Sequence, residues 1–146
     1  MGQRRKAREY ALQGLYMFEM RKGEDEDAGT LLAEVTSLEW VDGDVADDIR
    51  SFAIRLITGV NEKAVEIDAL INKYSKNWKL ERISAVDKSI LRMSLFEMLF
   101  VPEVPAAATI NEGIELGKLY GGDGSGQFIN GVLDAVNRTE LKAGRS

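Results

Sequence analysis

The sequence predicts an all-α protein of six to seven helices in a single domain. Apolar residues recur at intervals of three and four along most of the 146-residue chain, which is the spacing of one face of an α-helix. A sustained alternation of apolar and polar residues, which would indicate strands, is absent from the sequence. A chain of this length can bury a substantial hydrophobic core, so we expect residues 1–146 to fold as one domain.

Four helices are expected in the first half of the chain. The first runs from Arg5 to Met20 with one apolar face, and a short second helix spans about Gly29 to Leu38. Asp44 is placed to cap a third amphipathic helix, and a fourth ends at Tyr74. Residues 75–83 show no periodic pattern, so we expect them to connect the two halves of the fold.

The segment from Ser84 to Val101 is expected to be the central helix, because its apolar residues fall on more than one face. Ser84 is a good N-cap, and Asp87 places a negative charge near the positive end of the helix dipole. Pro102 ends the helix, since proline cannot continue the backbone hydrogen bonds. Arg92 is unusual in so apolar a helix, because its guanidinium must reach an acid, the surface or a ligand.

Two further helices are expected over about residues 105–120 and 125–137, separated by the glycine-rich segment Gly121–Gly126. The outer glycines of this segment match the spacing of a P-loop. Gln127 and Phe128 stand where that motif requires Lys and Ser or Thr, so we exclude a nucleotide triphosphate site. The amides at the start of the last helix could still meet a backbone phosphate, and a simple connection between helices is an equal alternative.

The composition excludes most catalytic and metal sites. The chain has no histidine and no cysteine, which removes the usual nucleophile–base pairs and zinc ligand sets. Glu112 and Glu115 share a helix face, a spacing that is ordinary on a solvated surface. We therefore expect no enzyme activity, no cofactor and no metal site. Without cysteines or an apolar run of about 18 residues, we also expect a cytoplasmic protein without a membrane segment.

The net charge of −5 is unevenly distributed along the chain. A basic block at the N-terminus consists of Arg4, Arg5, Lys6 and Arg8. Such a block on an acidic protein can steer a polyanion to one place, although a solvated terminus is the simpler alternative. Tyr16 and Phe128 are candidates to stack on the bases of a single strand, and each also fits the apolar face of its helix.

Four segments together resemble the NusB family of bacterial transcription antitermination factors. They read RRKAREYALQGLYMFE near the N-terminus, VDKSILRMSLFEML in the central helix, VPAAATINEGIELGKLYG after it, and QFINGVLD near the C-terminus. Their order and spacing match the family over nearly the whole chain. The resemblance implies an all-α fold of two packed helical bundles, at about residues 9–74 and 84–138, behind a basic arm of about residues 1–8.

The resemblance also implies a non-catalytic function. Members of the family bind the boxA element of ribosomal RNA leader transcripts as single-stranded RNA. They act as a heterodimer with NusE, a ribosomal small-subunit protein, in the antitermination complex of RNA polymerase. The implied RNA-binding residues are Arg4, Arg5, Lys6, Arg8, Asp123, Ser125 and Phe128. The implied NusE-binding residues are Tyr16, Asp87 and Arg92.

The glycine loop departs from the family at two positions. The family usually has an acid directly before the serine and a basic residue directly before the phenylalanine, whereas this chain has Gly124 and Gln127. We therefore expect the basic arm to supply a larger share of RNA affinity. Ribosomal RNA methyltransferases with a NusB-like domain are an unsuitable model, because this chain has no cysteine nucleophile and no room for a cofactor-binding sheet. A helical protein-interaction module without specific RNA binding remains the alternative function, and a homodimer is possible.

Overall fold

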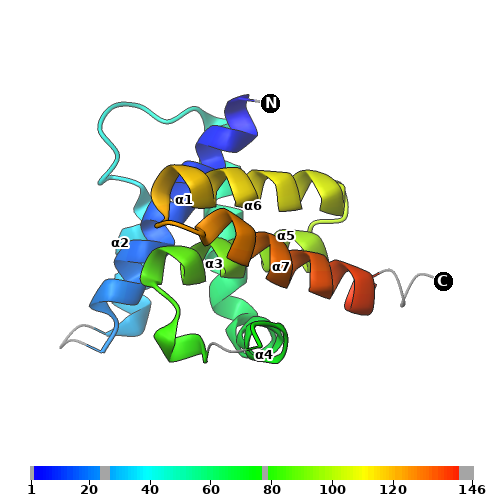
Figure 1. Cartoon of the computed structure of the whole chain (residues 1–146). Coiled ribbons are helices and arrows are strands. Elements are labelled where there is room, and N and C mark those ends of the chain that lie inside the picture. Colours follow the sequence, from blue (N-terminus) through cyan, green and yellow to red (C-terminus); the bar gives the residue numbers. More distant parts are fainter. Residues whose placement is uncertain (1, 24–26, 77–78, 142–146) are drawn as a thin grey trace. The chain divides into compact units, whose positions relative to one another are not determined.

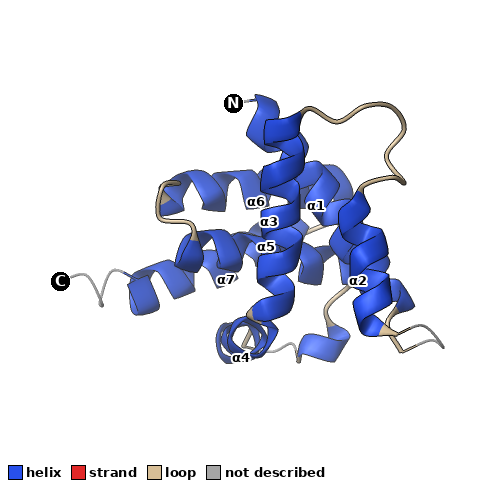
Figure 2. Ribbon diagram, turned by 180° about the vertical axis from the view of Figure 1, so that it is seen from behind, coloured by secondary structure: helices blue, strands red, loops and turns tan. Residues whose placement is uncertain are grey.

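A computed structural model describes residues 2–23, 27–76 and 79–141 of the chain. Within these ranges it has seven α-helices, one short 3₁₀ turn and one short π turn, and no strand (Figures 1 and 2). The predicted all-α class is therefore confirmed. The elements in chain order are α1 (Gly2–Arg21), α2 (Ala28–Ser37), α3 (Asp47–Glu62), α4 (Ala64–Tyr74), η1 (Leu80–Arg82), α5 (Ala85–Phe100), α6 (Ala106–Tyr120), α7 (Ser125–Val136) and η2 (Asn137–Leu141).

The helix boundaries differ from the prediction at two places that matter. The basic block is helical, because α1 begins at Gly2 and residues 4–8 lie in its first turns. The third helix begins at Asp47, three residues after the expected cap Asp44. Asp47 and Asp48 put two negative side chains in the first turn of α3, where the helix dipole favours them.

Contacts divide the chain into two compact units, Met1–Glu62 and Lys63–Ser146. The first unit holds α1, α2 and α3, and the second holds the remaining elements. The division lies ahead of α4, earlier than the connection that we expected at residues 75–83. It lies there because α4 packs on α5 and α7, which makes α4 part of the second unit.

The core of the first unit forms where α1 packs on α2 and α3. Gly14 allows the close approach, because a Cβ there would lie 2.9 Å from both Ile57 Cδ1 and Val35 Cγ1. The Trp40 indole Nε1 donates a hydrogen bond to the Val35 carbonyl at 2.8 Å, which fixes the turn after α2. The α1 side chains Ala7, Ala11, Leu12 and Leu15 are buried, as the helical spacing predicted.

The core of the second unit surrounds α5, which contacts α4, α6 and α7. Ten of the 16 residues of α5 are buried, so the expectation of a central helix is confirmed. The predicted cap is also present, since Ser84 Oγ accepts a hydrogen bond from the Asp87 amide at 3.1 Å. Helices α6 and α7 run antiparallel, joined by the glycine loop (Figure 1).

Arg92 of α5 binds an acid, one of the three possibilities that the sequence left open. Its Nε and Nη2 atoms donate to the two carboxylate oxygens of Asp68 at 2.8 and 3.0 Å. Asp68 lies on α4, so this bidentate pair joins α4 to α5. Such pairs are strong because two parallel charge-assisted bonds form at once.

A polar cluster holds η2 against the end of α4. Lys73 Nζ lies 3.2 Å from Glu140 Oε2, and the Tyr74 hydroxyl donates a hydrogen bond to the same oxygen. The bond from Tyr74, and then that from Lys73, lower the pKa of Glu140 below its ordinary value of 4.5. The bond to Glu140 in turn raises the pKa of Lys73 above 10.5.

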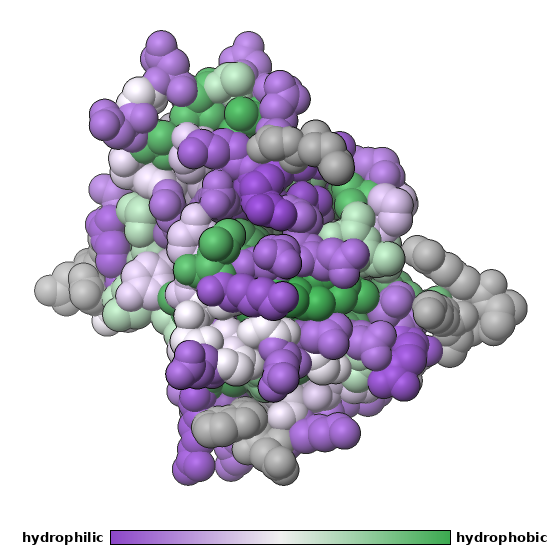
Figure 3. All heavy atoms as spheres, turned by 45° about the horizontal axis from the view of Figure 1, so that its top comes forward, coloured by the Kyte–Doolittle hydropathy of each residue, from purple (hydrophilic) through white to green (hydrophobic). Residues whose placement is uncertain are grey.

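The surface mixes hydrophilic side chains with smaller apolar areas on the face that Figure 3 draws. The large apolar side chains that are most exposed are Val65, Leu119, Met20, Tyr120 and Tyr16. No helix in the described part of the chain combines the length and the hydropathy that crossing a membrane would need.

The close packing of α6 on α7 predicts a specific loss of stability. A Cβ on Gly117 would lie 2.7 Å from Ile129 Cδ1 and 3.3 Å from the Gly126 amide nitrogen. Overpacking of this kind costs about 1–3 kcal/mol, which outweighs the gain of roughly 1 kcal/mol in helix propensity. We expect Gly117→Ala to lower the free energy of unfolding in urea.

Gly131→Ala on α7 is the matched control, because a Cβ there meets no atom within 4 Å. The free energy of unfolding of this variant should rise by about 0.4–1 kcal/mol. Equal stabilities for the two variants would mean that α6 and α7 are packed less closely than described.

The Glu140 cluster predicts a pH-dependent contribution to stability. Because the pKa of Glu140 is lowered on folding, the contribution is complete above its ordinary value of 4.5 and is lost as pH falls through the lowered value. We expect Glu140→Gln to melt below the parent at about pH 6.5 and to approach the parent as pH falls through the lowered pKa of Glu140. The control is Glu39→Gln, which changes an exposed acid outside this cluster. Its melting temperature should not converge on that of the parent at low pH. The same convergence in Glu39→Gln would mean that net charge, and not the cluster, causes the effect.

Candidate nucleic-acid interface

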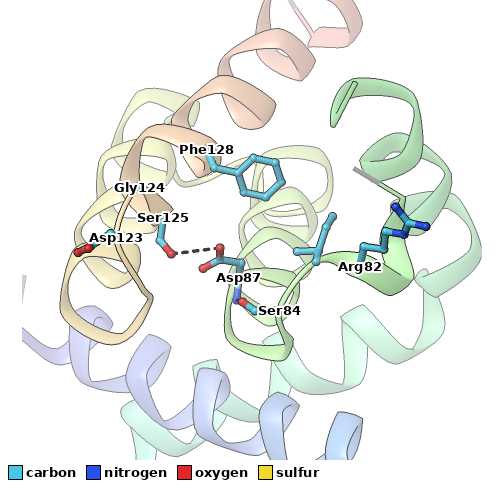
Figure 4. Close-up of a pocket in the computed structure, with 8 residues that line it drawn as sticks. Arg82, Ser84, Asp87, Asp123, Gly124, Ser125 and Phe128 are labelled. Carbon is cyan, nitrogen blue, oxygen red and sulfur yellow. Dashed lines mark hydrogen bonds between the residues drawn. The ribbon is translucent and has the colours of Figure 1, made fainter. Parts of the chain in front are cut away.

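A pocket in the second unit lies where three segments meet (Figure 4). Its volume is about 220 Å³. The segments are the end of η1 with the start of α5, the glycine loop, and the start of α7. The lining residues are Arg82, Ile83, Ser84, Asp87, Asp123, Gly124, Ser125 and Phe128.

The pocket is organised by the Asp87 carboxylate. Ser125 Oγ donates a hydrogen bond to Asp87 Oδ2 at 3.1 Å, which joins the start of α7 to the start of α5 (Figure 4). Ser84 fixes the backbone of Asp87, since its hydroxyl accepts a hydrogen bond from the Asp87 amide. The second carboxylate oxygen, Oδ1, is buried and has no hydrogen-bond partner among the described residues.

The course of the glycine loop toward Asp87 depends on two positions, Gly121 and Gly124, that lack side chains. Gly124 has a φ of +82°, a left-handed conformation that favours glycine. A Cβ on Gly121 would lie 2.6 Å from Ser125 Cβ and 2.8 Å from the Gly117 carbonyl oxygen. The Phe128 amide then donates to the Gly124 carbonyl at 3.0 Å and begins the helical pattern of α7.

The charge of the pocket argues against a phosphate at the start of α7. A helix N-terminus attracts anions, but the Asp87 carboxylate already occupies that position through Ser125. Figure 4 shows the Arg82 guanidinium across the pocket from Ser125, and the Asp123 carboxylate pointing away from Asp87. The pocket therefore offers a ring and one cation at its edge.

The Phe128 ring lines this pocket and is partly exposed. An aromatic ring beside an accessible hollow can stack on an unpaired base. The sequence left open whether Phe128 belongs to the core or to a binding surface, and its position at the pocket favours the surface.

The basic block of the first unit lies close to aromatic rings. The Arg4 guanidinium carbon is 4.4 Å from the centre of the Phe52 ring, and that of Arg8 is 5.7 Å from it. Lys6 Nζ is 5.3 Å from the centre of the Tyr10 ring. These distances are those of cation–π contacts, which hold the cations in defined positions.

The four predicted cations differ in accessibility. Arg4 and Lys6 are exposed and Arg5 is half-buried. Arg8 is only 5% exposed, so its guanidinium mainly makes contacts inside the first unit, such as that with Phe52. The exposed positive charge of the block is therefore concentrated on Arg4 and Lys6.

The residues predicted to bind a protein partner have three different environments. Tyr16 on α1 is 40% exposed, with its ring available on the first unit. Asp87 lies in the pocket of the second unit, beside residues that were assigned to RNA. Arg92 is paired with Asp68.

Two features of the candidate interface were missed by the sequence analysis. Arg82 lines the pocket but lies in the segment where no pattern was found. Phe52 lies beneath two cations and reads in the sequence as an ordinary core residue of α3. Helical periodicity alone gives no signal for either contact, because each joins different elements. Among the described residues no group of acids could hold a metal ion.

Comparison with known proteins gives consistent matches over nearly the whole chain. The family model described as NusB family matches residues 5–138. A transcription antitermination protein NusB from Desulforapulum autotrophicum is 46% identical over 136 residues, covering 93% of this chain and 92% of the relative. The protein of the same name from Geobacter sulfurreducens is 46% identical over 139 residues, covering 95% and 96%.

Solved structures match as well. NusB from T. maritima has a TM-score of 0.80 at 36% identity, covering 93% of this chain and 91% of that chain. A crystal structure of antitermination factors NusB and NusE in complex with double-stranded RNA has a TM-score of 0.75 at 26% identity, covering 94% and 98%.

Proposed function

Because this chain belongs to the NusB family of transcription antitermination proteins, we propose that it binds the boxA element of ribosomal RNA leader transcripts as a heterodimer with NusE. In this role it is part of the antitermination complex of RNA polymerase and promotes read-through of ribosomal RNA operons. It acts by binding alone, without catalysis.

The observation that carries the proposal is the pairing of accessible cations with aromatic rings. Arg4 and Lys6 are exposed cations held over Phe52 and Tyr10 in the first unit. In the second unit the Phe128 ring lines a pocket with Arg82 at its edge. Cations for phosphates and rings for bases are the two features that single-stranded RNA requires. A similar structure contains NusB and NusE in complex with double-stranded RNA. This similarity supports RNA and NusE as the two classes of ligand.

RNA binding then divides between the two units. Arg4, Lys6 and the half-buried Arg5 neutralise phosphates. The buried Arg8 lies near the same Phe52 ring as Arg4 and helps to hold that ring in place. Phe128 stacks on an unpaired base, while Ser125 and Asp123 shape the loop that leads to it. Each unit supplies a different part of the recognition, so RNA affinity depends on both.

We assign NusE binding to Tyr16 in the first unit and to Asp87 and Arg92 in the second unit. Tyr16 offers an exposed ring, and Asp87 lies in the pocket at the start of α5. Arg92 holds α5 against α4 through Asp68, which keeps the start of α5 in place for the partner.

The deciding experiment measures RNA affinity by fluorescence anisotropy. The probes are a boxA single strand, a scrambled single strand and a boxA duplex, each with and without NusE. We expect tightest binding to the boxA single strand, with a preference that sharpens when NusE is present. Equal and weak binding to all three probes would leave the alternative, a helical module that binds only protein.

The basic block predicts the salt dependence of RNA binding. If Arg4, Arg5 and Lys6 each engage a phosphate, log affinity should fall against log salt with a slope of about −2, from roughly 0.7 per phosphate. Replacing the two exposed cations in Arg4→Gln/Lys6→Gln should reduce the magnitude of the slope by about 1.4.

Lys76→Gln/Arg138→Gln is the control for this slope, because it removes the same charge from exposed positions of the second unit, away from the pocket. It should leave the slope unchanged. An equal reduction in both double variants would show that net charge, and not the basic block, sets the salt dependence.

Phe128 predicts a loss of affinity that depends on the ring itself. Phe128→Leu keeps an apolar side chain on α7 but removes the stacking surface, which is worth about 1–3 kcal/mol per base. We expect RNA affinity to fall about 5- to 150-fold in the anisotropy titration. Phe128→Tyr keeps a ring and should bind nearly as the parent does. Parent-like affinity in Phe128→Leu would remove the stacking role.

A further inference from the structure

Arg82 is the one residue lining the pocket of the second unit that carries a positive charge. It is the last residue of η1, and its side chain is exposed. Within the described ranges its guanidinium forms no ion pair. The five donors of an arginine then face water, or a ligand when one is bound. The guanidinium is therefore available to an anionic group that reaches the edge of the pocket.

The backbone that carries Arg82 is held on both sides. The Arg82 amide donates a hydrogen bond to the Lys79 carbonyl at 2.9 Å. Before it, the Leu80 amide donates to Asn72 Oδ1 at 3.0 Å, which ties η1 to α4. After it, the Ile83 side chain is buried. Only the end of the Arg82 side chain has to be ordered by a ligand, which lowers the cost of binding.

The charges around the pocket distinguish its two sides. The Asp87 carboxylate lies beside the start of α7 through its bond with Ser125, and its negative charge repels a phosphate from that side. Figure 4 shows the Phe128 ring extending from α7 toward the side where Arg82 lies. A nucleotide with its base at the ring therefore has its phosphate favoured at the Arg82 edge.

The size of the pocket limits what it can hold. Its volume of about 220 Å³ is below the roughly 300–1,000 Å³ of pockets that enclose whole small-molecule ligands. It suits a single base, with the sugar and the phosphate outside. This is the arrangement in which one nucleotide of a longer strand can enter while the strand continues along the surface.

On the basis of the proposed function, we propose that Arg82 and Phe128 form a site for one unpaired nucleotide of the RNA. The Phe128 ring stacks on the base, and the Arg82 guanidinium donates two hydrogen bonds to the adjoining phosphate. Arginine suits this role because its planar donors match two phosphate oxygens at once. The bases of a duplex remain stacked on one another, so the site selects single strands. The phosphate contact adds to those of the basic block in the first unit.

The test measures affinity by fluorescence anisotropy across a salt series, for a boxA single strand, a scrambled single strand and a boxA duplex. The variants are Arg82→Gln, Phe128→Leu and the double variant that combines them. Lys79→Gln is the matched control, because Lys79 is an exposed cation three residues before Arg82 that does not line the pocket. Thermal melts verify that each variant is folded.

We expect Arg82→Gln to reduce the magnitude of the salt slope for single strands by about 0.7, because one phosphate contact is lost. Over the decade from about 1 M to about 0.1 M salt, this difference lowers affinity about fivefold. Lys79→Gln should leave the slope and the affinity unchanged, and the duplex should bind Arg82→Gln as it binds the parent. In the Phe128→Leu background, Arg82→Gln should lower affinity only about twofold or less, because residues that hold one nucleotide act together.

Equal affinities and slopes for Arg82→Gln and Lys79→Gln would overturn the site. A full loss of about fivefold in the Phe128→Leu background would overturn it as well, because Arg82 would then act apart from the ring. Either result, with a parent that still prefers boxA, contradicts the nucleotide site and not the proposed function.

The opposite failure gives a different result. A parent without boxA preference would overturn the proposed function alone, because stacking on a ring and contact with a phosphate do not depend on base sequence. The loss in Arg82→Gln on the scrambled single strand then still decides the site. A parent that binds none of the three probes would overturn both.

Discussion

The burial of α5 on several sides is the constraint on which the second unit depends. Apolar residues on more than one face of this helix can leave water only if α4, α6 and α7 all pack around it. The polar groups on α5 must then find partners inside the unit. Arg92 pairs with Asp68, and Thr109 donates to the buried Glu97 carboxylate. The start of α5 is the exception, since Asp87 there retains an oxygen without a donor among the described residues.

Close helix packing and the shape of the candidate site have one origin. Helices α6 and α7 approach each other where glycines replace side chains, at Gly117 and at Gly121. The same approach carries the start of α7 to α5, so that Ser125 meets Asp87 and Phe128 comes to line the pocket. The glycines of the loop thus serve the packing of α6 on α7. The position of the pocket follows from where that packing puts α7.

The two units combine charge and aromatic surface in different ways. In the first, cations lie over Phe52 and Tyr10 and keep positive charge at the start of α1, on a chain whose net charge is −5. In the second, the Asp87 carboxylate lies beside the start of α7, and the Phe128 ring lines the pocket with Arg82. Positive charge beside aromatic rings is therefore found mainly in the first unit, whereas the second unit combines a ring with a carboxylate and one cation.

The sequence by itself determined the all-α class, the central helix with its Ser84 cap, and the composition that excludes histidine and cysteine chemistry, because periodicity, capping and composition are local properties. It also identified the family, through the order of four motifs. Only the tertiary structure decided that Arg92 meets Asp68, that Arg8 is buried while Arg4 is exposed, and that α4 belongs with α5. It alone brought Asp87 to Ser125, because a contact between elements 38 residues apart depends on how helices pack and leaves no trace in the spacing of either segment.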